Sequence, residues 1–315
     1  YYIGLSALEV QRPLALVSGE DAHYISVLSE YIRRGESATY ILDDFLSKEV
    51  QSIDLQRARL LLGIAYYEQG QHADALAQLN SIEEKGLYHY ECDKANLLRA
   101  YLYLQGEQTD KPQFDKALAL IQSAKQGKSI WAEQARLYEA NIVWSKGRSD
   151  EAMKLLEKGE WSAEIMPEVE YTGALIACSR SNAESALKVT EQLVAKYPEM
   201  GRRPRLLGAK ASVLSRLGRY DEAIRILEPL ANNDTLLEEE NYTLGMAYYK
   251  MKRYDDAIAP LKKATKGNGT LAAYSSFALG NIYRYKGDPM SAQLAFEQAL
   301  RASDDSGLIE EDARY

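Results

Sequence analysis

Residues 244–261 read LGMAYYKMKRYDDAIAPL, and residues 62–79, which lie 182 positions earlier, read LGIAYYEQGQHADALAQL. In the later copy, apolar residues recur every three to four positions from Leu244 to Met251, which is the spacing of one helix face. After a short polar turn, a second apolar stripe runs from Ala257 to Ala264. Alternating, strand-like patterning is scarce along the chain. The stretch therefore predicts two helices joined by a tight turn, in a chain that is helical throughout.

A small residue marks the same place in the first helix of each such pair. The series is Leu28, Gly63, Ala100, Ala140, Ala174, Ala211, Gly245 and Gly280, at intervals of 34 to 40 residues. A second series follows twelve residues behind most of these: Ala75, Ala152, Ala186, Ala223, Ala257 and Ala292. Small residues at both places let the two helices approach closely, which explains a glycine inside a helix despite its cost of about 1 kcal/mol.

Four glycines lie five residues before alanines of the second series: Gly70, Gly147, Gly218 and Gly287. A first helix has to end there, and a helix end often needs a residue with left-handed backbone geometry. These glycines are therefore predicted to terminate their helices. Two prolines, Pro229 and Pro260, fall inside second helices and are predicted to bend them.

The pattern resembles the tetratricopeptide repeat (TPR), whose period is 34 residues. Residues 279–300, LGNIYRYKGDPMSAQLAFEQAL, place Leu279, Gly280, Tyr283, Ala292 and Phe296 at the positions of the family pattern. The early tryptophan of that pattern is absent everywhere, and its closing proline survives only as Pro198. The resemblance is to bacterial-type members and implies an all-α, right-handed solenoid, a superhelix of about sixteen or seventeen antiparallel helices without a sheet.

The resemblance divides the chain into about eight repeats over residues 21–302. Residues 1–20 are expected to end a preceding repeat, and residues 303–315 to begin a further helix. The chain opens on YYIGLSALEV, without a methionine, so we expect it to be a piece of a longer protein.

Composition and motifs argue against several classes of function. The net charge of −8 is unlike that of proteins that bind nucleic-acid phosphates, and no apolar run approaches the ~18 residues of a membrane span. The two cysteines, Cys92 and Cys178, are expected to remain free thiols. No histidine lies in a metal-binding pattern, and no phosphate loop or nucleophile motif occurs. We therefore expect no metal, no cofactor and no catalytic activity.

Adjacent tyrosines predict both a core and a binding groove. At the packing position of the family, Tyr31, Tyr66, Tyr103, Tyr248 and Tyr283 are expected to be core. A neighbouring residue on a helix points about 100° away, toward the concave groove in this family. The predicted groove residues are Tyr67, Tyr101, Trp144, Tyr171, Tyr242, Tyr249, Tyr274, Asn281, Arg284 and Tyr285. The alternative is that these side chains pack on one another inside a tight superhelix.

Two longer connections leave a further question open. The turn around Pro112 is about six residues longer than its equivalents, and Arg202, Arg203 and Arg205 cluster after Pro198. Both are interpreted either as loop growth at the surface or as a second contact site. The family's clamp for a C-terminal carboxylate needs lysines that are absent beside Asn141 and Asn281, so recognition of that kind is not expected.

The sequence thus favours a scaffold or adaptor that binds a protein or peptide segment, within a larger bacterial assembly. One alternative is a carbohydrate- or cell-wall-binding module that uses the same aromatic residues. Another is a structural solenoid that associates end to end. The bacterial periplasm or cell surface is favoured over the cytoplasm as location, and the partner is left open.

Overall fold

The computed structural model describes residues 19–48, 55–105, 113–232, 236–266 and 269–303. These residues form sixteen α-helices and no β-strand, which confirms the all-α prediction for the described part of the chain. The long turn at Pro112 and the expected flanking segments at both ends lie outside the described residues, so those predictions stay as they are.

The chain divides into two compact units, residues 1–169 and 170–315. The helices of the first unit are α1 (Gly19–Arg33), α2 (Ala38–Lys48), α3 (Leu55–Glu68), α4 (His72–Asn80), α5 (His89–Gln105), α6 (Phe114–Ala124), α7 (Ile130–Ser145) and α8 (Ser149–Lys158). The boundary falls within α9 (Met166–Ser179). The second unit continues with α10 (Ala183–Lys196), α11 (Pro204–Arg216), α12 (Tyr220–Asn232), α13 (Glu238–Lys250), α14 (Tyr254–Ala264), α15 (Thr270–Tyr285) and α16 (Pro289–Ser303). Two short 3₁₀ segments cover Glu84–Gly86 and Pro198–Arg202.

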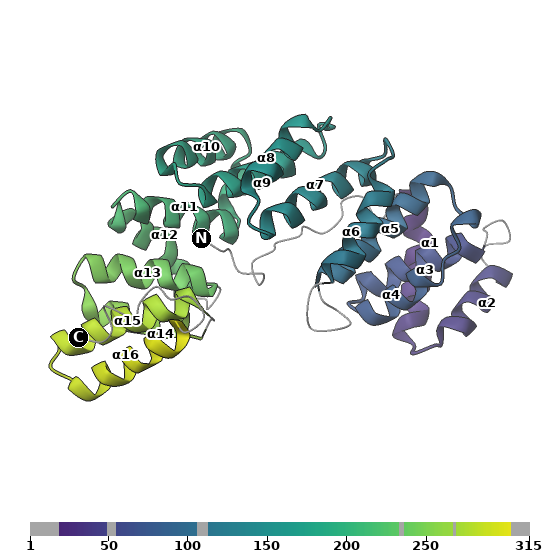
Figure 1. The fold of residues 1–315 in the computed structure, drawn as a ribbon. Coiled ribbons are helices and arrows are strands. Elements are labelled where there is room, and N and C mark those ends of the chain that lie inside the picture. Colours follow the sequence, from purple (N-terminus) through teal and green to yellow (C-terminus); the bar gives the residue numbers. More distant parts are fainter. Residues whose placement is uncertain (1–18, 49–54, 106–112, 233–235, 267–268, 304–315) are drawn as a thin grey trace. The chain divides into compact units, whose positions relative to one another are not determined.

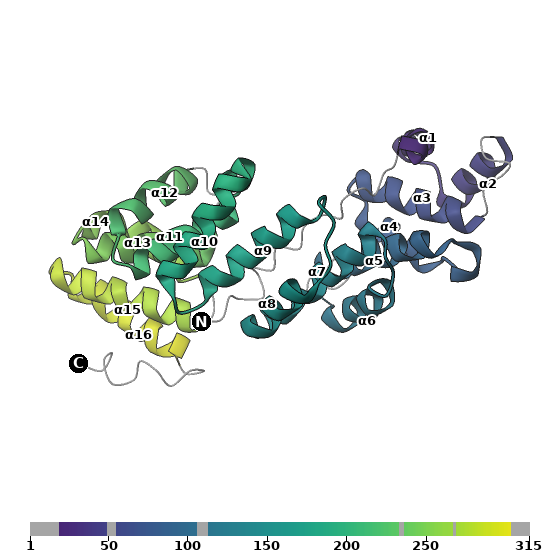
Figure 2. The same cartoon turned by 90° about the horizontal axis from the view of Figure 1, so that it is seen from above.

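Each unit is a stack of helix hairpins (Figures 1 and 2). In the first unit α3 packs on α4, α5 on α6 and α7 on α8; in the second, α11 packs on α12, α13 on α14 and α15 on α16. The first helices of neighbouring hairpins also pack together, as in α5 with α7 and α13 with α15. No hairpin can bury its apolar face alone, and stacking joins these faces into a continuous core within each unit.

The predicted small-residue positions are the closest contacts within the hairpins. A methyl group added at Gly245 would lie 2.6 Å from Leu261 Cγ, and one at Gly280 would lie 2.5 Å from the Phe296 ring. At Gly63 it would meet Leu79 at 2.9 Å. The facing alanines, including Ala75 and Ala257, are fully buried. The prediction that the three glycines lie at tight helix–helix contacts is confirmed.

The turns of the hairpins adopt the left-handed backbone that was predicted. Gly70, Gly147, Gly218 and Gly287 have φ between 73° and 79°. The equivalent position of the α13–α14 hairpin is Lys252, which has φ 60°. Among the described residues, Lys252 is the one non-glycine with positive φ.

The core tyrosines lie where the family position places them. Tyr66, Tyr103 and Tyr248 are buried, while Tyr31 and Tyr283 are half-buried and pack against the core. The Tyr248 hydroxyl donates to the Glu228 carboxylate, and burial together with this bond raises the pKa of Tyr248.

The remaining structural expectations concern prolines and cysteines. Pro229 and Pro260 do lie inside α12 and α14, although the bending of these helices stays a prediction. Cys92 and Cys178 are both free, as expected.

Candidate partner-binding face

Exposed and half-buried aromatic residues lie on two neighbouring first helices of the second unit. On α13, Tyr242, Met246 and Tyr249 recur at helical spacing and are half-buried. On α15, Tyr274 is 39% exposed and Tyr285 is 74% exposed. With Asn281 and Arg284 of α15, these five residues form what is called here the tyrosine face. All seven belong to elements of one unit, and six of them are residues that the sequence predicted for the groove; the seventh is Met246.

A tyrosine from a second helix joins the two parts of this face. Tyr254, the first residue of α14, lies 5.8 Å from the Tyr249 ring and 4.6 Å from the Tyr285 ring, measured between ring centroids. The C-terminal ends of α13 and α15 therefore meet in a cluster of three rings. Aromatic pairs at such distances contribute a favourable interaction energy in addition to that of burying the rings. The cluster fixes Tyr249 and Tyr285 on the same side of the unit.

Sequence reasoning missed Tyr254, although its signal is in the sequence. The residue two places after the turn is aromatic in three hairpins, as His72, Tyr220 and Tyr254. In the first unit the equivalent pair, Tyr67 and His72, also stacks, with ring centroids 5.5 Å apart. A ring at the start of the second helix thus supports the second tyrosine of the pair in both copies.

Two of the three predicted groove residues of the first unit are buried, and the third, Tyr101, is half-buried. Tyr67 and Trp144 are each only 8% exposed, and their assignment to an open groove is wrong. The Tyr67 ring lies between His72 and the edge of Tyr101, whose own ring also approaches Tyr138. Rings of this size gain more from mutual packing than from contact with water. At Tyr67 and Tyr101 the contacts are those of the alternative interpretation, in which the side chains pack on one another.

The same correction applies at Tyr171 in the second unit. Its side chain is 1% exposed, and the guanidinium of Arg203 lies 4.5 Å from its ring centroid. The arginine cluster after Pro198 therefore covers an aromatic core residue with one of its members. Arg202 is exposed and Arg205 is half-buried, so these two remain at the surface.

A buried charge network replaces the open groove near the start of α5. Lys94 is 3% exposed and lies 3.4 Å from Asp21, and Arg57 joins Asp21 to Glu91. Burial lowers the pKa of Lys94, while the charge of Asp21 acts in the opposite direction. The network ties α1, α3 and α5 together, which is a structural role.

The first unit also displays an aromatic stack that the sequence did not indicate. Tyr88 and Tyr90 stack with ring centroids 5.8 Å apart, and Tyr90 stacks on Trp131 at 5.9 Å. Tyr88 is 68% exposed. Tyr88 and Tyr90 flank the start of α5, outside the residues that line first helices in the family, so family spacing gave no reason to select them.

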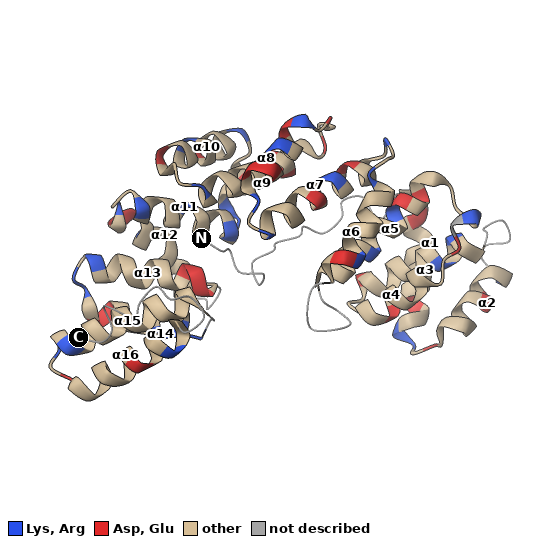
Figure 3. Ribbon diagram, in the orientation of Figure 1, with Lys and Arg blue, Asp and Glu red and all other residues tan. Residues whose placement is uncertain are grey.

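The charged residues of the second unit's first helices are distributed unevenly (Figure 3). On α11, α13 and α15, acidic residues are confined to the first turn of α13, as Glu238, Glu239 and Glu240. Glu240 is buried and accepts a hydrogen bond from the Leu237 N–H at 2.7 Å, which stabilises the helix start. Beyond that turn α11, α13 and α15 carry basic residues and no acidic one.

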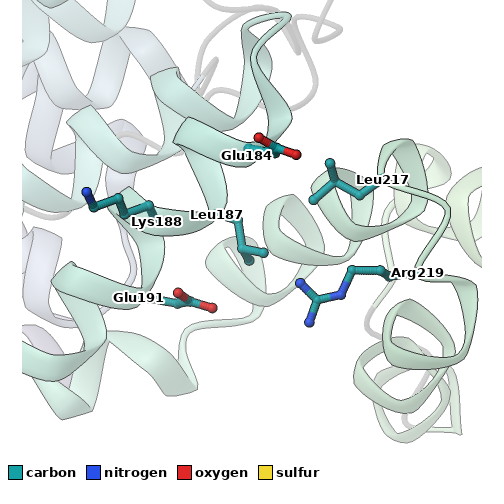
Figure 4. Close-up of a pocket in the computed structure, with 6 residues that line it drawn as sticks. All are labelled: Glu184, Leu187, Lys188, Glu191, Leu217 and Arg219. Carbon is teal, nitrogen blue, oxygen red and sulfur yellow. The ribbon is translucent and has the colours of Figure 1, made fainter.

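A hollow of about 300 Å³ lies away from the tyrosine face (Figure 4). Its lining comes from α10 and the end of α11: Glu184, Leu187, Lys188, Glu191, Leu217 and Arg219. Arg219 reaches toward Glu191 in this view and donates two hydrogen bonds to Glu222. The hollow contains no histidine, cysteine or hydroxyl nucleophile. Its charges are those of an ordinary surface ion-pair cluster.

Two other kinds of site are not found in the described part of the chain. None of its helices has the length and apolar character needed to cross a bilayer. Across the same residues, no three side chains of the metal-binding types come together.

Comparison with solved structures shows the same architecture. A chain of the APC/C hetero-tetramer Cut9–Hcn1 is 17% identical, with a TM-score of 0.61; the match covers 98% of the present chain and 57% of that one. A tetratricopeptide repeat protein from Parabacteroides merdae is 18% identical over 94% of this chain and 98% of its own, with a TM-score of 0.37. MamA from Desulfovibrio magneticus RS-1 is 19% identical over 54% and 94%, with a TM-score of 0.41. At these identities the likeness concerns the fold.

Family comparison agrees with the repeat pattern. No curated protein matches the sequence. A family model described as tetratricopeptide repeat matches residues 60–129 and 209–275, and a second with the same description matches residues 273–306. The first contains Gly63 and Gly245, and the second contains Gly280, so the matches fall on the best-conforming hairpins. The chain belongs to the tetratricopeptide repeat family.

Proposed function

We propose that the chain is a non-enzymatic scaffold that binds a protein or peptide segment on the tyrosine face of its second unit. Tetratricopeptide repeat proteins commonly serve as protein-interaction scaffolds. The observation that carries the proposal is the exposure of large rings on adjacent, rigid first helices, with Tyr285 at 74% and Tyr274 at 39%. Aromatic side chains in such a position supply contact area at a small entropic cost and are enriched at binding hot spots.

The polar members of the face fit the same role. The Arg284 guanidinium donates to Asn281 Oδ1 at 2.9 Å, so both side chains are oriented before any partner arrives. An oriented amide and guanidinium can hydrogen-bond to a peptide backbone without first losing rotamer freedom. A larger bacterial assembly, at the periplasm or cell surface, is the setting that we propose for this scaffold.

Quantitative partner capture tests the proposal. The full chain is immobilised, an extract of the source cells is passed over it, and retained proteins are quantified by mass spectrometry. Tyr242→Ala/Tyr285→Ala should reduce recovery of the principal partner about tenfold or more, since hot-spot rings each contribute on the order of 2 kcal/mol. Tyr88→Ala is the matched control, because it removes an exposed ring outside the face. Equal recovery by the face variant and the control would refute the proposal.

A further inference from the structure

We propose that the segment bound by the tyrosine face is acidic, with aspartate or glutamate residues next to apolar or aromatic ones. This inference rests on the proposed function and specifies the chemistry of the partner. It is drawn from the charges that surround the rings.

The second unit differs in charge from the chain as a whole. Residues 170–315 contain 20 Lys and Arg and 20 Asp and Glu, a net charge of 0, whereas the whole chain carries −8. The helices that bear the face differ in charge from the rest of this unit. Apart from the three glutamates in the first turn of α13, the helices α11, α13 and α15 carry no Asp or Glu (Figure 3).

Three basic residues lie in the last turns of the three first helices in succession. They are Arg216 of α11, Lys250 of α13 and Arg284 of α15, and all three are exposed. Lys250 directly follows Tyr249, and Arg284 directly precedes Tyr285, so two of the charges border the ring cluster. A basic residue at a helix C-terminus is favoured by the helix dipole, which explains each residue singly. The dipole does not explain why α11, α15 and the part of α13 after Glu240 carry no acidic residue.

The bonding of these residues sets them apart from the basic residues in the nearby turns. Arg219 pairs with Glu222, Arg253 with Asp256 and Lys286 with Asp255. Within the described residues, Arg216, Lys250 and Arg284 form no ion pair: Arg216 donates to the backbone carbonyls of Cys178 and Arg180, and Arg284 donates to the Asn281 amide. In the described part of the chain, none of the three therefore has a carboxylate partner at ion-pair distance.

An acidic partner would supply the missing charge. Carboxylates of a bound segment could accept hydrogen bonds from the remaining guanidinium donors of Arg284 and from the Lys250 ammonium. Apolar or aromatic side chains of the same segment would cover Tyr249, Tyr254 and Tyr285. Such complementarity mainly raises the association rate and selects among partners, while the rings contribute most of the affinity.

Selection from random peptides tests this inference directly. A display library of random 12-residue peptides is selected on the full 315-residue chain, and enriched peptides are resynthesised and titrated by fluorescence anisotropy. We expect enriched sequences to carry net negative charge and at least one aromatic or large apolar residue. Their affinity should fall about tenfold or more in Lys250→Glu/Arg284→Glu and should weaken as salt is added.

The control separates this inference from the proposed function. Lys146→Glu/Lys266→Glu produces the same change in net charge at exposed positions that are not part of the face and should alter affinity less than about twofold. Neutral or basic peptides that require Tyr249 would overturn the acidic inference and leave the proposed function intact. Peptides whose binding is unaffected by Tyr249→Ala would overturn both. A selection that yields no acidic sequence would also overturn the inference.

Discussion

At the scale of the residue, Lys252 occupies a backbone conformation that five equivalent turns, including the one at Gly35, give to glycine. Its φ is 60°, whereas Gly70, Gly147, Gly218 and Gly287 lie between 73° and 79°. A side chain in the left-handed region costs roughly 1–2 kcal/mol. The sequence predicted the turns at Gly70, Gly147, Gly218 and Gly287 because glycine marks them, and the turn at Lys252 could be located only from the repeat spacing.

Replacing Lys252 by glycine should therefore stabilise the α13–α14 hairpin. The strain is removed, and part of the gain is lost because glycine has more freedom in the unfolded chain. We expect a net increase of about 0.5–1 kcal/mol in the free energy of unfolding, measured by urea denaturation. Gly218→Lys in the equivalent turn is the converse variant and should lose a similar amount. A decrease for Lys252→Gly would contradict this explanation.

The two cysteines should differ in reactivity by virtue of burial. Burial raises the pKa of Cys178 to about 12, and the neighbouring Arg216 charge lowers it only in part. Because the thiolate is the reactive form, Cys178 should resist alkylation in the folded protein at pH 8, while the half-buried Cys92 reacts. Mass spectrometry after iodoacetamide treatment would show one modified cysteine when folded and two in denaturant. Equal labelling of both in the folded state would disprove the burial of Cys178.

At the scale of the element, the two nearly identical hairpins α3–α4 and α13–α14 bury their second tyrosine to different extents. Tyr67 is 8% exposed and touches Tyr101 of the next first helix. The residue at that place after α13 is Asn281, which is too small to cover Tyr249. The residue that decides the exposure thus lies in the following repeat.

This comparison shows which part of the site the sequence could provide. Helix number and turn glycines depend on contacts within one hairpin, and the core tyrosines occupy a position that recurs from repeat to repeat, so their spacing predicted them. Exposure of a groove residue depends on the volume of side chains in the next repeat, so Tyr67, Trp144 and Tyr171 were assigned wrongly. Tyr254 and the Tyr88–Tyr90–Trp131 stack were missed because the family pattern gives those positions no fixed residue.

A larger residue at Gly245 tests how far destabilisation of one hairpin spreads to the other hairpins of the stack. Helix propensity favours alanine over glycine by about 1 kcal/mol, but the added methyl would lie 2.6 Å from Leu261 Cγ and 3.1 Å from the Leu261 backbone nitrogen. We expect Gly245→Ala to lose about 1–2 kcal/mol net, because overpacking of a core costs roughly 1–3 kcal/mol.

Hydrogen exchange measures where that destabilisation acts. Each hairpin contacts only its neighbours, so exchange should accelerate in α11–α16 and remain unchanged in α1–α4. Gly19→Ala is the control, because a methyl group there meets no atom within 4 Å. An even acceleration along the whole chain would show that stability is shared more widely than a nearest-neighbour stack allows.

At the scale of the whole molecule, the chain combines two helical units of different surface character. In the first unit the predicted groove residues are mostly buried, and in the second the tyrosine face is open and bordered by basic residues. The net charge of −8 comes from the first unit, because residues 170–315 contain equal numbers of basic and acidic residues. We expect binding to be concentrated on the second unit, rather than spread evenly over eight hairpins.

Tyr248 and Tyr249 are adjacent on one helix, and we expect Tyr248 to stabilise the core and Tyr249 to contact the partner. Both variants, Tyr248→Ala and Tyr249→Ala, are measured by urea unfolding and by partner capture. Tyr248→Ala should lose roughly 3–5 kcal/mol, because it removes a buried ring that is hydrogen-bonded to Glu228.

Tyr249→Ala should lose less than about 1 kcal/mol of stability, since its ring is only half-buried, and should weaken partner binding by ~2 kcal/mol, or about thirtyfold. We expect this separation of the two effects. Equal destabilisation by the two substitutions, or full partner capture by Tyr249→Ala, would contradict it.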